Sequence, residues 1–154
     1  MRNENAGKAI LYGVEAIVGF RLGEKLTGEA VLNYTHGVQI STAGTSSPDD
    51  RIPPLNGRVS TQYRFNDAIS LRADLVYSAH QDRLSDRDVA DPRIDPDGSA
   101  GWAVLNAAVE IRGNGGFRYG IRGANIFDKL YREHGSGIDA IGRSLGLWFS
   151  FEMN

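Results

Sequence analysis

The sequence predicts an all-β protein, an antiparallel up-and-down meander of about seven strands. The main observation is a period of two, because apolar and polar residues alternate along most of the chain, as in strands with one apolar face. The 19 glycines indicate frequent turns, and no segment has the period of 3.6 that is typical of an amphipathic helix. Short and long connections alternate between these segments, which is the pattern of a meander.

Seven segments alternate, and in each of them the register opposite the apolar one is polar or mixed. In chain order, the apolar registers are Ile10, Tyr12, Val14, Ala16, Val18 and Phe20 in residues 9–21; Ala30, Leu32 and Tyr34 in 29–38; Val59, Thr61, Tyr63 and Phe65 in 58–65; Ile69, Leu71, Ala73, Leu75, Tyr77 and Ala79 in 69–80; Ala103, Leu105, Ala107, Val109 and Ile111 in 103–112; Phe117, Tyr119 and Ile121 in 117–122; and Leu145, Leu147, Phe149, Phe151 and Met153 in 144–153. Each segment is therefore predicted to be a strand.

The connections predict how the strands are arranged. The short ones cover residues 21–27, 65–68 and 113–116, and the long polar ones cover residues 37–56, 81–101 and 128–143. In a meander, all short turns then lie at one end of the sheet and all long loops at the other. Barrels of the outer-membrane type have this asymmetry.

Aromatic residues of the apolar registers are sorted by the end of the strand. Phe20, Phe65, Phe117 and Phe151 fall at the short-turn ends, and Tyr12, Tyr34 and Tyr77 at the long-loop ends. Aromatic residues are common in strands of all kinds, but two rows separated by aliphatic residues are typical of the girdles of a lipid-facing band. No second sheet or helix is predicted to cover the apolar face, so we expect it to contact lipid.

Composition excludes several classes of protein. The 154 residues suit one domain or part of a larger one, and 17 Lys and Arg against 19 Asp and Glu leave no basic surface for nucleic acid. The absence of cysteine excludes disulfides, thiolate metal sites and a cysteine nucleophile. The most apolar stretch, residues 9–20, contains Glu15 and is shorter than the roughly 18 residues of a membrane helix. We expect no export signal, because Met1 to Asn5 lead into no apolar segment of that type.

Four motifs are recognisable along the chain. They are Lys8-Ala-Ile-Leu-Tyr-Gly-Val-Glu15, Arg51-Ile-Pro-Pro-Leu-Asn-Gly-Arg58, Gly101-Trp-Ala-Val-Leu-Asn106, and Asn125-Ile-Phe-Asp-Lys-Leu-Tyr131 followed by Gly142-Arg143. Together, and in this order, they resemble the TonB-dependent outer-membrane receptors over residues 6–152. In that family an Asn-Leu-Phe-Asp-Lys motif ends the penultimate strand and a Gly-Arg pair opens the last one.

The predicted last strand also resembles the assembly signal of outer-membrane barrels. The matching positions are Ser144, Gly146, Phe149 and Phe151. The sequence departs from that signal at its end, where Glu152, Met153 and Asn154 follow the aromatic residue that usually terminates such barrels.

The resemblance implies that residues 1–154 form the last seven strands of a transmembrane β-barrel of about 22 strands, without its plug domain. It implies part of a Gram-negative outer-membrane receptor for energy-coupled uptake of an iron complex, haem, cobalamin or a similar scarce nutrient. The partners would be the lipid bilayer, the remainder of the barrel, the plug and, through the plug, the energy-coupling protein TonB. As an isolated chain we expect a non-transporting fragment.

Two alternatives stay open. Seven strands leave two unpaired edges, so the chain could be a self-associating β-module, a homo-oligomer with no transport role. A small lipid-binding barrel is the other alternative, and it would require an eighth strand.

Candidate ligand-binding residues are the three histidines near predicted long-loop ends, His36, His80 and His134, because the family includes haem and metal importers. Solvated histidines are common near loops, and no pair has the spacing of metal ligands. We expect no resident cofactor or metal, and haem or a ferric siderophore would be the transported ligand.

Charged residues of the polar registers are expected to line the lumen, where they pair across strands or contact the plug. The candidates are Glu15, Arg58, Arg64, Arg72, Arg118 and Arg122, with Arg64 and Arg118 favoured for plug contacts because they lie near the short-turn end.

The acidic loop 82–98 lacks the spacing of an EF-hand, so it is predicted to be a salt-bridged loop rather than a calcium site. Asx turns are expected at Asp91 and Asp95, with Arg83, Arg87 and Arg93 neutralising half of the charge. Ser136 lacks the strand–turn–helix setting of a catalytic serine, so no enzyme is predicted.

Overall fold

A computed structural model describes residues 7–152, and in these residues the chain forms an antiparallel sheet of eight strands. The elements are β1 (Lys8–Leu22), β2 (Leu26–Ile40), β3 (Ser46–Pro48), β4 (Asn56–Arg64), β5 (Ile69–Ser78), the helical turn α1 (Asp86–Val89), β6 (Trp102–Arg112), the 3₁₀ turn η1 (Asn114–Gly116), β7 (Phe117–Ala124) and β8 (Ser144–Phe151). The predicted all-β fold is confirmed. Two sequence features, Met153 of the last predicted strand and the start Met1 to Asn5, lie outside the described residues.

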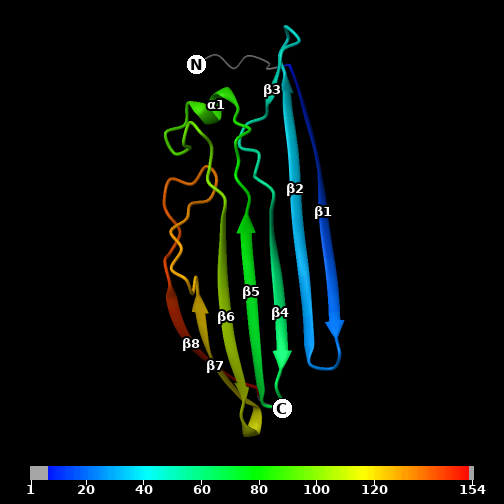
Figure 1. Ribbon diagram of the computed structural model, residues 1–154, viewed down its shortest axis with the longest axis vertical. Helices are drawn as coiled ribbons and strands as arrows, with labels where there is room; N and C mark the ends of the chain where they lie inside the picture. Colours follow the sequence, from blue (N-terminus) through cyan, green and yellow to red (C-terminus); the bar gives the residue numbers. More distant parts are fainter. Residues whose placement is uncertain (1–6, 153–154) are drawn as a thin grey trace.

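The long strands follow one another in the sheet in chain order, from β1 at one edge to β8 at the other (Figure 1). All seven predicted segments correspond to strands of this meander. The structure adds β3, α1 and η1, which alternation did not predict because each has only three or four residues. β3 pairs with the end of β2 and so lengthens one hairpin beyond the sheet.

The pairing register places all seven apolar registers on one face. Val14 lies opposite Tyr34, and Leu75 lies opposite both Val59 and Leu105. We call this the outer face, and the face of the opposite registers the inner face. Outer-face side chains remain exposed, at 64% for Val14 and 78% for Leu147, so nothing in residues 7–152 covers them.

The two aromatic rows lie on this outer face, at opposite ends, as predicted. Phe20 is next to the β1–β2 turn, and Phe117 packs against Phe151 with ring centroids 4.6 Å apart at the β7–β8 end. Tyr34 and Tyr77 lie toward the long loops. Strand pairing therefore aligns the aromatic residues of each row at one end of the sheet.

Burial is concentrated at the long-loop end. Apart from Val104, the buried apolar residues of the described chain are Ile52 and Ile94, which both lie in loops. The buried polar residues are Gln81, Ser85, Asp88 and Asn125. The packed part of the structure is thus a cluster of loops above one end of the sheet (Figure 1). Among residues 7–152, no helix has the length and apolar character needed to span a membrane.

Candidate functional site

Three long loops meet at this end: loop A (residues 41–55), loop B (79–101) and loop C (125–143). Loops A and B are joined by the buried Asp88, which is 1% exposed and whose carboxylate accepts hydrogen bonds from the backbone N–H groups of Arg51 and Ser85, at 3.2 Å each. The Ser85 hydroxyl accepts in turn from the Asp88 N–H at 3.1 Å, which completes a capping box at α1. Gln81 Nε2 donates to the Ile52 carbonyl at 2.8 Å. Loops A and B are therefore held as one packed unit.

The acidic part of loop B is folded largely as predicted. Asp91 and Asp95 each accept a hydrogen bond at 3.0 Å from the backbone N–H two residues later, so both predicted Asx turns are confirmed. Arg93 pairs with Asp91 at 2.6 Å and holds the pKa of that carboxyl well below its usual range. The expected neutralisation within the loop holds only for Arg93. Arg87 pairs with Asp50 of loop A at 3.2 Å, and Arg83 pairs with no carboxylate of the described residues, since its guanidinium donates instead to His36 Nδ1 at 2.8 Å.

Loop C is closed at its base by the Asn-Ile-Phe-Asp-Lys motif. The buried Asn125 has a φ of 47°, and its side-chain amide exchanges two hydrogen bonds of 2.9 Å with the backbone of Lys129. Asp128 accepts a hydrogen bond of 2.7 Å from the N–H of Arg143. The motif and the Gly-Arg pair, distant in sequence, therefore form one unit that sets where β8 begins.

A cavity of about 350 Å³ lies where loops A and C meet the inner face. Its wall includes Arg51 from loop A, Val76 and Trp102 from the sheet, and Glu133 and His134 from loop C. The Trp102 ring also packs on Tyr131, with centroids 4.3 Å apart. The cavity thus presents an aromatic face, an imidazole, the Glu133 carboxylate and the Arg51 guanidinium, which also pairs with Asp91, to one volume. The aromatic face and the guanidinium suit a planar ligand that carries polar groups.

His134 is the predicted histidine that lines this cavity. Its Nδ1 lies 2.8 Å from the Ser99 hydroxyl, whereas its Nε2 is buried without a hydrogen-bond partner in the described structure. Burial lowers the pKa of His134, an effect that the charge of Asp88 opposes and that of Arg51 reinforces. The imidazole is therefore neutral at pH 7, and its Nε2 is a buried polar atom without a partner beside the cavity.

The structure does not bring the three predicted histidines together. His36 lies on the outer face and stacks on Tyr12 with ring centroids 4.8 Å apart, while His80 is exposed just beyond β5. In the part of the chain that the structure describes, no group of three or more His, Asp or Glu side chains is arranged to hold a metal ion.

The predicted lumen-facing residues all belong to the inner-face register. Their ion pairs, and those of their neighbours, are Arg58 with Glu29 at 3.3 Å, Arg72 with Asp74 at 2.9 Å, Arg112 with Glu110 at 3.3 Å and Arg118 with Glu152 at 2.6 Å. The first joins β2 to β4, and the last joins β7 to Glu152, the residue that follows β8, whereas the other two join residues of one strand. Pairing between neighbouring segments of the sheet therefore accounts for half of these contacts.

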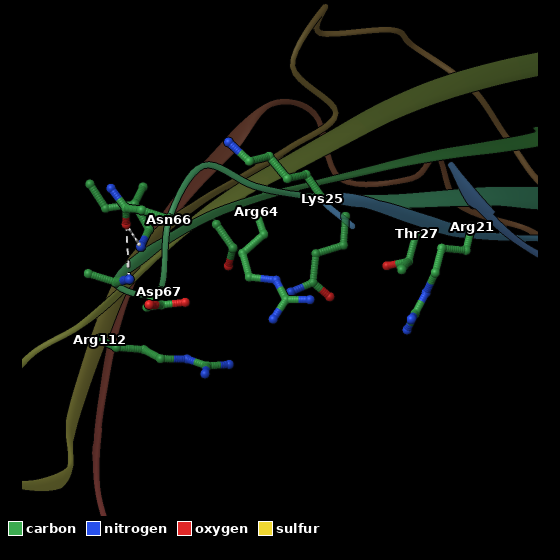
Figure 2. Close-up of a pocket in the computed structure, with 11 residues that line it drawn as sticks. Arg21, Lys25, Thr27, Arg64, Asn66, Asp67 and Arg112 are labelled. Atoms are coloured by element: carbon green, nitrogen blue, oxygen red, sulfur yellow. Dashed lines mark hydrogen bonds between the residues drawn. The ribbon is translucent and has the colours of Figure 1, made fainter. Parts of the chain in front are cut away.

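A second cavity, of about 290 Å³, lies at the short-turn end of the inner face (Figure 2). Arg21, Lys25, Arg64 and Arg112 contribute to its wall, and Asp67 is the one carboxylate there. Within the described residues, no carboxylate forms an ion pair with Arg21, Lys25 or Arg64. We call this the basic cavity, since positive charge exceeds negative charge in its wall.

Solved structures of transport receptors share this fold. The copper transporter OprC matches with a TM-score of 0.77 and 24% identity, over 93% of this chain and 23% of OprC. The siderophore receptor PiuA from Acinetobacter baumannii matches with a TM-score of 0.69 and 16% identity, over 94% of this chain and 22% of PiuA. The closed form of the ferric-catecholate import receptor Fiu from E. coli K12 matches with a TM-score of 0.67 and 21% identity, over 93% of this chain and 21% of Fiu. The sheet therefore has the fold of part of the barrel of these TonB-dependent receptors.

The resemblance seen in the motifs is thereby confirmed at the level of the fold. The chain spans less than a quarter of the length of each of these proteins, which are transport receptors and not enzymes. No protein-family model and no curated protein matches the sequence.

Sequence reasoning missed three residues as site candidates: Arg51 and Trp102, which line the cavity, and Tyr131, which packs on Trp102. Trp102 carried a usable signal, because it stands in the inner-face register opposite Ser78, where the other strands place polar residues. Arg51 and Tyr131 carried none, since both lie in loops that have no periodicity.

Proposed function

We propose that the chain forms part of the barrel of an outer-membrane receptor for energy-coupled uptake of a scarce nutrient, such as an iron complex or haem. The observation that carries this proposal is the two-faced sheet, apolar and exposed on one side and charged on the other, in the fold of OprC, PiuA and Fiu. In the proposed orientation the outer face contacts the bilayer of a Gram-negative outer membrane, and the long loops face the exterior.

The ligand would enter at the long-loop cavity. Trp102 offers an aromatic surface, Arg51 a guanidinium that is already paired with Asp91, and His134 a neutral nitrogen without a protein partner. A metal chelate with a planar or anionic ligand shell matches these groups. We rank His134 above His80, which is exposed outside the cavity, and above His36, which lies on the outer face.

The inner face would contact the plug, which is linked to TonB. The basic cavity supports this role, because Arg21, Lys25 and Arg64 lack carboxylate partners in residues 7–152 and would need counter-charges once covered. Arg118 pairs with Glu152, so for that residue plug contact requires exchange of an existing ion pair.

The ligand-binding proposal is tested by fluorescence in detergent. The chain has two tryptophans, so Trp148→Phe leaves Trp102 as the single reporter at the cavity wall. A ferric catecholate, haemin and Cu²⁺ would be titrated in turn. We expect one of them to quench the fluorescence saturably, and we expect His134→Gln to weaken that binding about tenfold, which corresponds to one lost metal or charge-assisted contact.

His80→Gln is the matched control, since it removes an exposed histidine of the same loop end. Equal weakening by both substitutions, or no saturable quenching by any of the three probes, would contradict ligand binding in this cavity. Fractionation of cells that produce the chain tests the location, which must be the outer membrane.

Self-association without transport is a second candidate, because β1 and β8 each pair on one side only among the described residues. Light scattering across a tenfold dilution distinguishes the candidates. A mass that falls on dilution, and that is reduced by Gly146→Lys on β8, favours the self-associating module. A small closed barrel is not supported, since the eighth strand, β3, pairs with β2 and leaves β1 and β8 apart.

The assembly-signal residues stay a proposal. Ser144 and Gly146 face inward on β8, and Phe149 and Phe151 lie on the outer face opposite Tyr119 and Phe117. Recognition by an assembly factor would use the exposed edge that β8 forms in the described chain.

A further inference from the structure

The outer face carries a polar and aromatic cluster at its long-loop end that ligand uptake does not require. It consists of Tyr12, Tyr34, His36 and Arg83, which we call the rim cluster. The His36 ring stacks on Tyr12, and its Nδ1 lies 2.8 Å from Arg83 Nη1 and 3.3 Å from Tyr34 Oη. Because Tyr12 lies opposite His36 and Tyr34 opposite Val14, the cluster continues the apolar outer face.

Arg83 differs from the other arginines of loop B. Arg87 pairs with Asp50 and Arg93 with Asp91, whereas Arg83 has no carboxylate partner in the described structure. Its backbone N–H donates to the side-chain oxygen of Gln81 at 3.2 Å, which fixes the start of the loop, and its guanidinium reaches back to the outer face. A cation is therefore directed onto an apolar surface without a counter-charge.

The guanidinium keeps unused hydrogen-bonding capacity. A guanidinium has five N–H donors. In the described structure His36 is the one side chain that accepts a hydrogen bond from the guanidinium of Arg83. Tyr12 and Tyr34 are 58% and 42% exposed, so their hydroxyl groups are accessible from the same side. Lys8, in the same outer register of β1, adds a second cation near this rim. These groups offer hydrogen-bond donors and positive charge that suit an oxygen-rich anion.

We propose that the rim cluster binds the phosphate of an anionic lipid headgroup. The proposal rests on the proposed function, since it requires the outer face to lie in a bilayer with the long loops at one surface. Tyrosines concentrate at that depth, guanidinium groups bind phosphate through paired N–H donors, and basic residues gain free energy next to anionic headgroups. The lipid is chosen over free phosphate because the cluster borders the apolar band, where acyl chains would cover Val14 and its neighbours.

The test measures lipid retention by the full chain in detergent, using native mass spectrometry with phosphatidylglycerol or phosphatidylcholine added. We expect preferential retention of phosphatidylglycerol, and we expect Arg83→Gln to reduce it about fivefold, the effect of one basic residue at an anionic surface. Arg87→Gln removes the same charge from the same loop but from a site that pairs with Asp50, so retention should not change.

Three results would overturn the inference: no preference for phosphatidylglycerol, equal losses in both variants, or displacement of the lipid by millimolar inorganic phosphate. The last result would assign the site to free phosphate. Insertion into phosphatidylcholine vesicles is measured separately by protection of the strands from protease. Failure of the wild-type chain to insert would contradict the proposed function, whereas insertion without a headgroup preference would contradict this inference alone.

Discussion

Replacing Leu71 by Arg tests whether the outer face lies in lipid. Leu71 belongs to the outer register of β5, between Tyr63 and Val109, and the adjacent Ser70 faces inward, between Arg64 and Glu110. The two positions share one strand and nearly one depth, and they differ in the face to which the side chain points. An arginine at position 70 would face the open, polar inner side, where it can share Glu110 with Arg112, whereas an arginine at position 71 would face the acyl chains.

The expected magnitude follows from the depth of Leu71. The outer register of β5 runs from Ile69 to Tyr77. At about 3.3 Å per residue and a tilt of about 40°, this stretch spans roughly 20 Å of membrane depth, close to the ~25 Å apolar band of such barrels. Leu71 then lies about 5 Å from the middle, where an arginine costs about 2–4 kcal/mol. We expect the lower end, about 2 kcal/mol, which is roughly a 30-fold change in the folding equilibrium.

The assay is reversible urea unfolding of the chain in lipid vesicles, followed by tryptophan fluorescence. Leu71→Arg should lower the free energy of unfolding by this amount, and Ser70→Arg should change it by less than about 0.5 kcal/mol, as for most surface substitutions. The same contrast measured in a water-soluble state without lipid would be much smaller. If both substitutions destabilise the vesicle-bound chain equally, the outer face is not the lipid-facing one.

Three further predictions concern the loops and one close contact. Asp88→Ala leaves the N–H groups of the buried Ser85 and of Arg51 without an acceptor. Hydrogen exchange in loops A and B should therefore accelerate, because the local opening free energy falls by about 1–3 kcal/mol, while exchange in β5 stays slow. Because burial lowers the pKa of His134, the unfolded chain binds a proton at this residue more readily than the folded chain does. Packing of loop C should therefore be strongest above pH 6.5 and weaken as the pH falls. In a proteolysis assay, His134→Gln should remove that dependence on pH. Gly57→Ala would place a Cβ 2.6 Å from the Tyr77 hydroxyl and should destabilise the sheet by about 1–3 kcal/mol in urea unfolding, whereas Gly19→Ala, with no atom within 4 Å, should have little effect.

The sheet was predictable because alternation fixes the face of every residue once strands pair one to one. No bulge interrupts the register of the seven long strands. Val14 at one edge, Leu75 in the middle and Leu147 at the other edge therefore lie on the same face. The β1–β2 and β6–β7 turns were also predictable from their glycines. Gly23 and Gly115 take positive φ values there, which other residues rarely adopt. Local chemistry at short range therefore determined most of the fold.

The loops were predictable only where their contacts are local. The Asx turns at Asp91 and Asp95 involve residues two positions apart, and both formed as expected. The contacts that build the cavity instead join segments that alternation does not order, such as Arg51 to Asp88 across 37 residues. Sequence reasoning had no means to pair a backbone N–H in one loop with a carboxylate in another.

Arg83 and His36 show how these two kinds of information must be combined. Counting charges within the acidic loop assigned Arg83 to neighbouring aspartates, because opposite charges close in sequence are often close in space. The register already placed His36 on the outer face, two residues from Tyr34, so its position weighed against ligand binding on the inner face. What the sequence could not supply was the 2.8 Å contact between them, across 47 residues. An arginine that leaves an acidic loop for an apolar face gives up available ion pairs, and such a cost is offset when an anion at that surface takes their place.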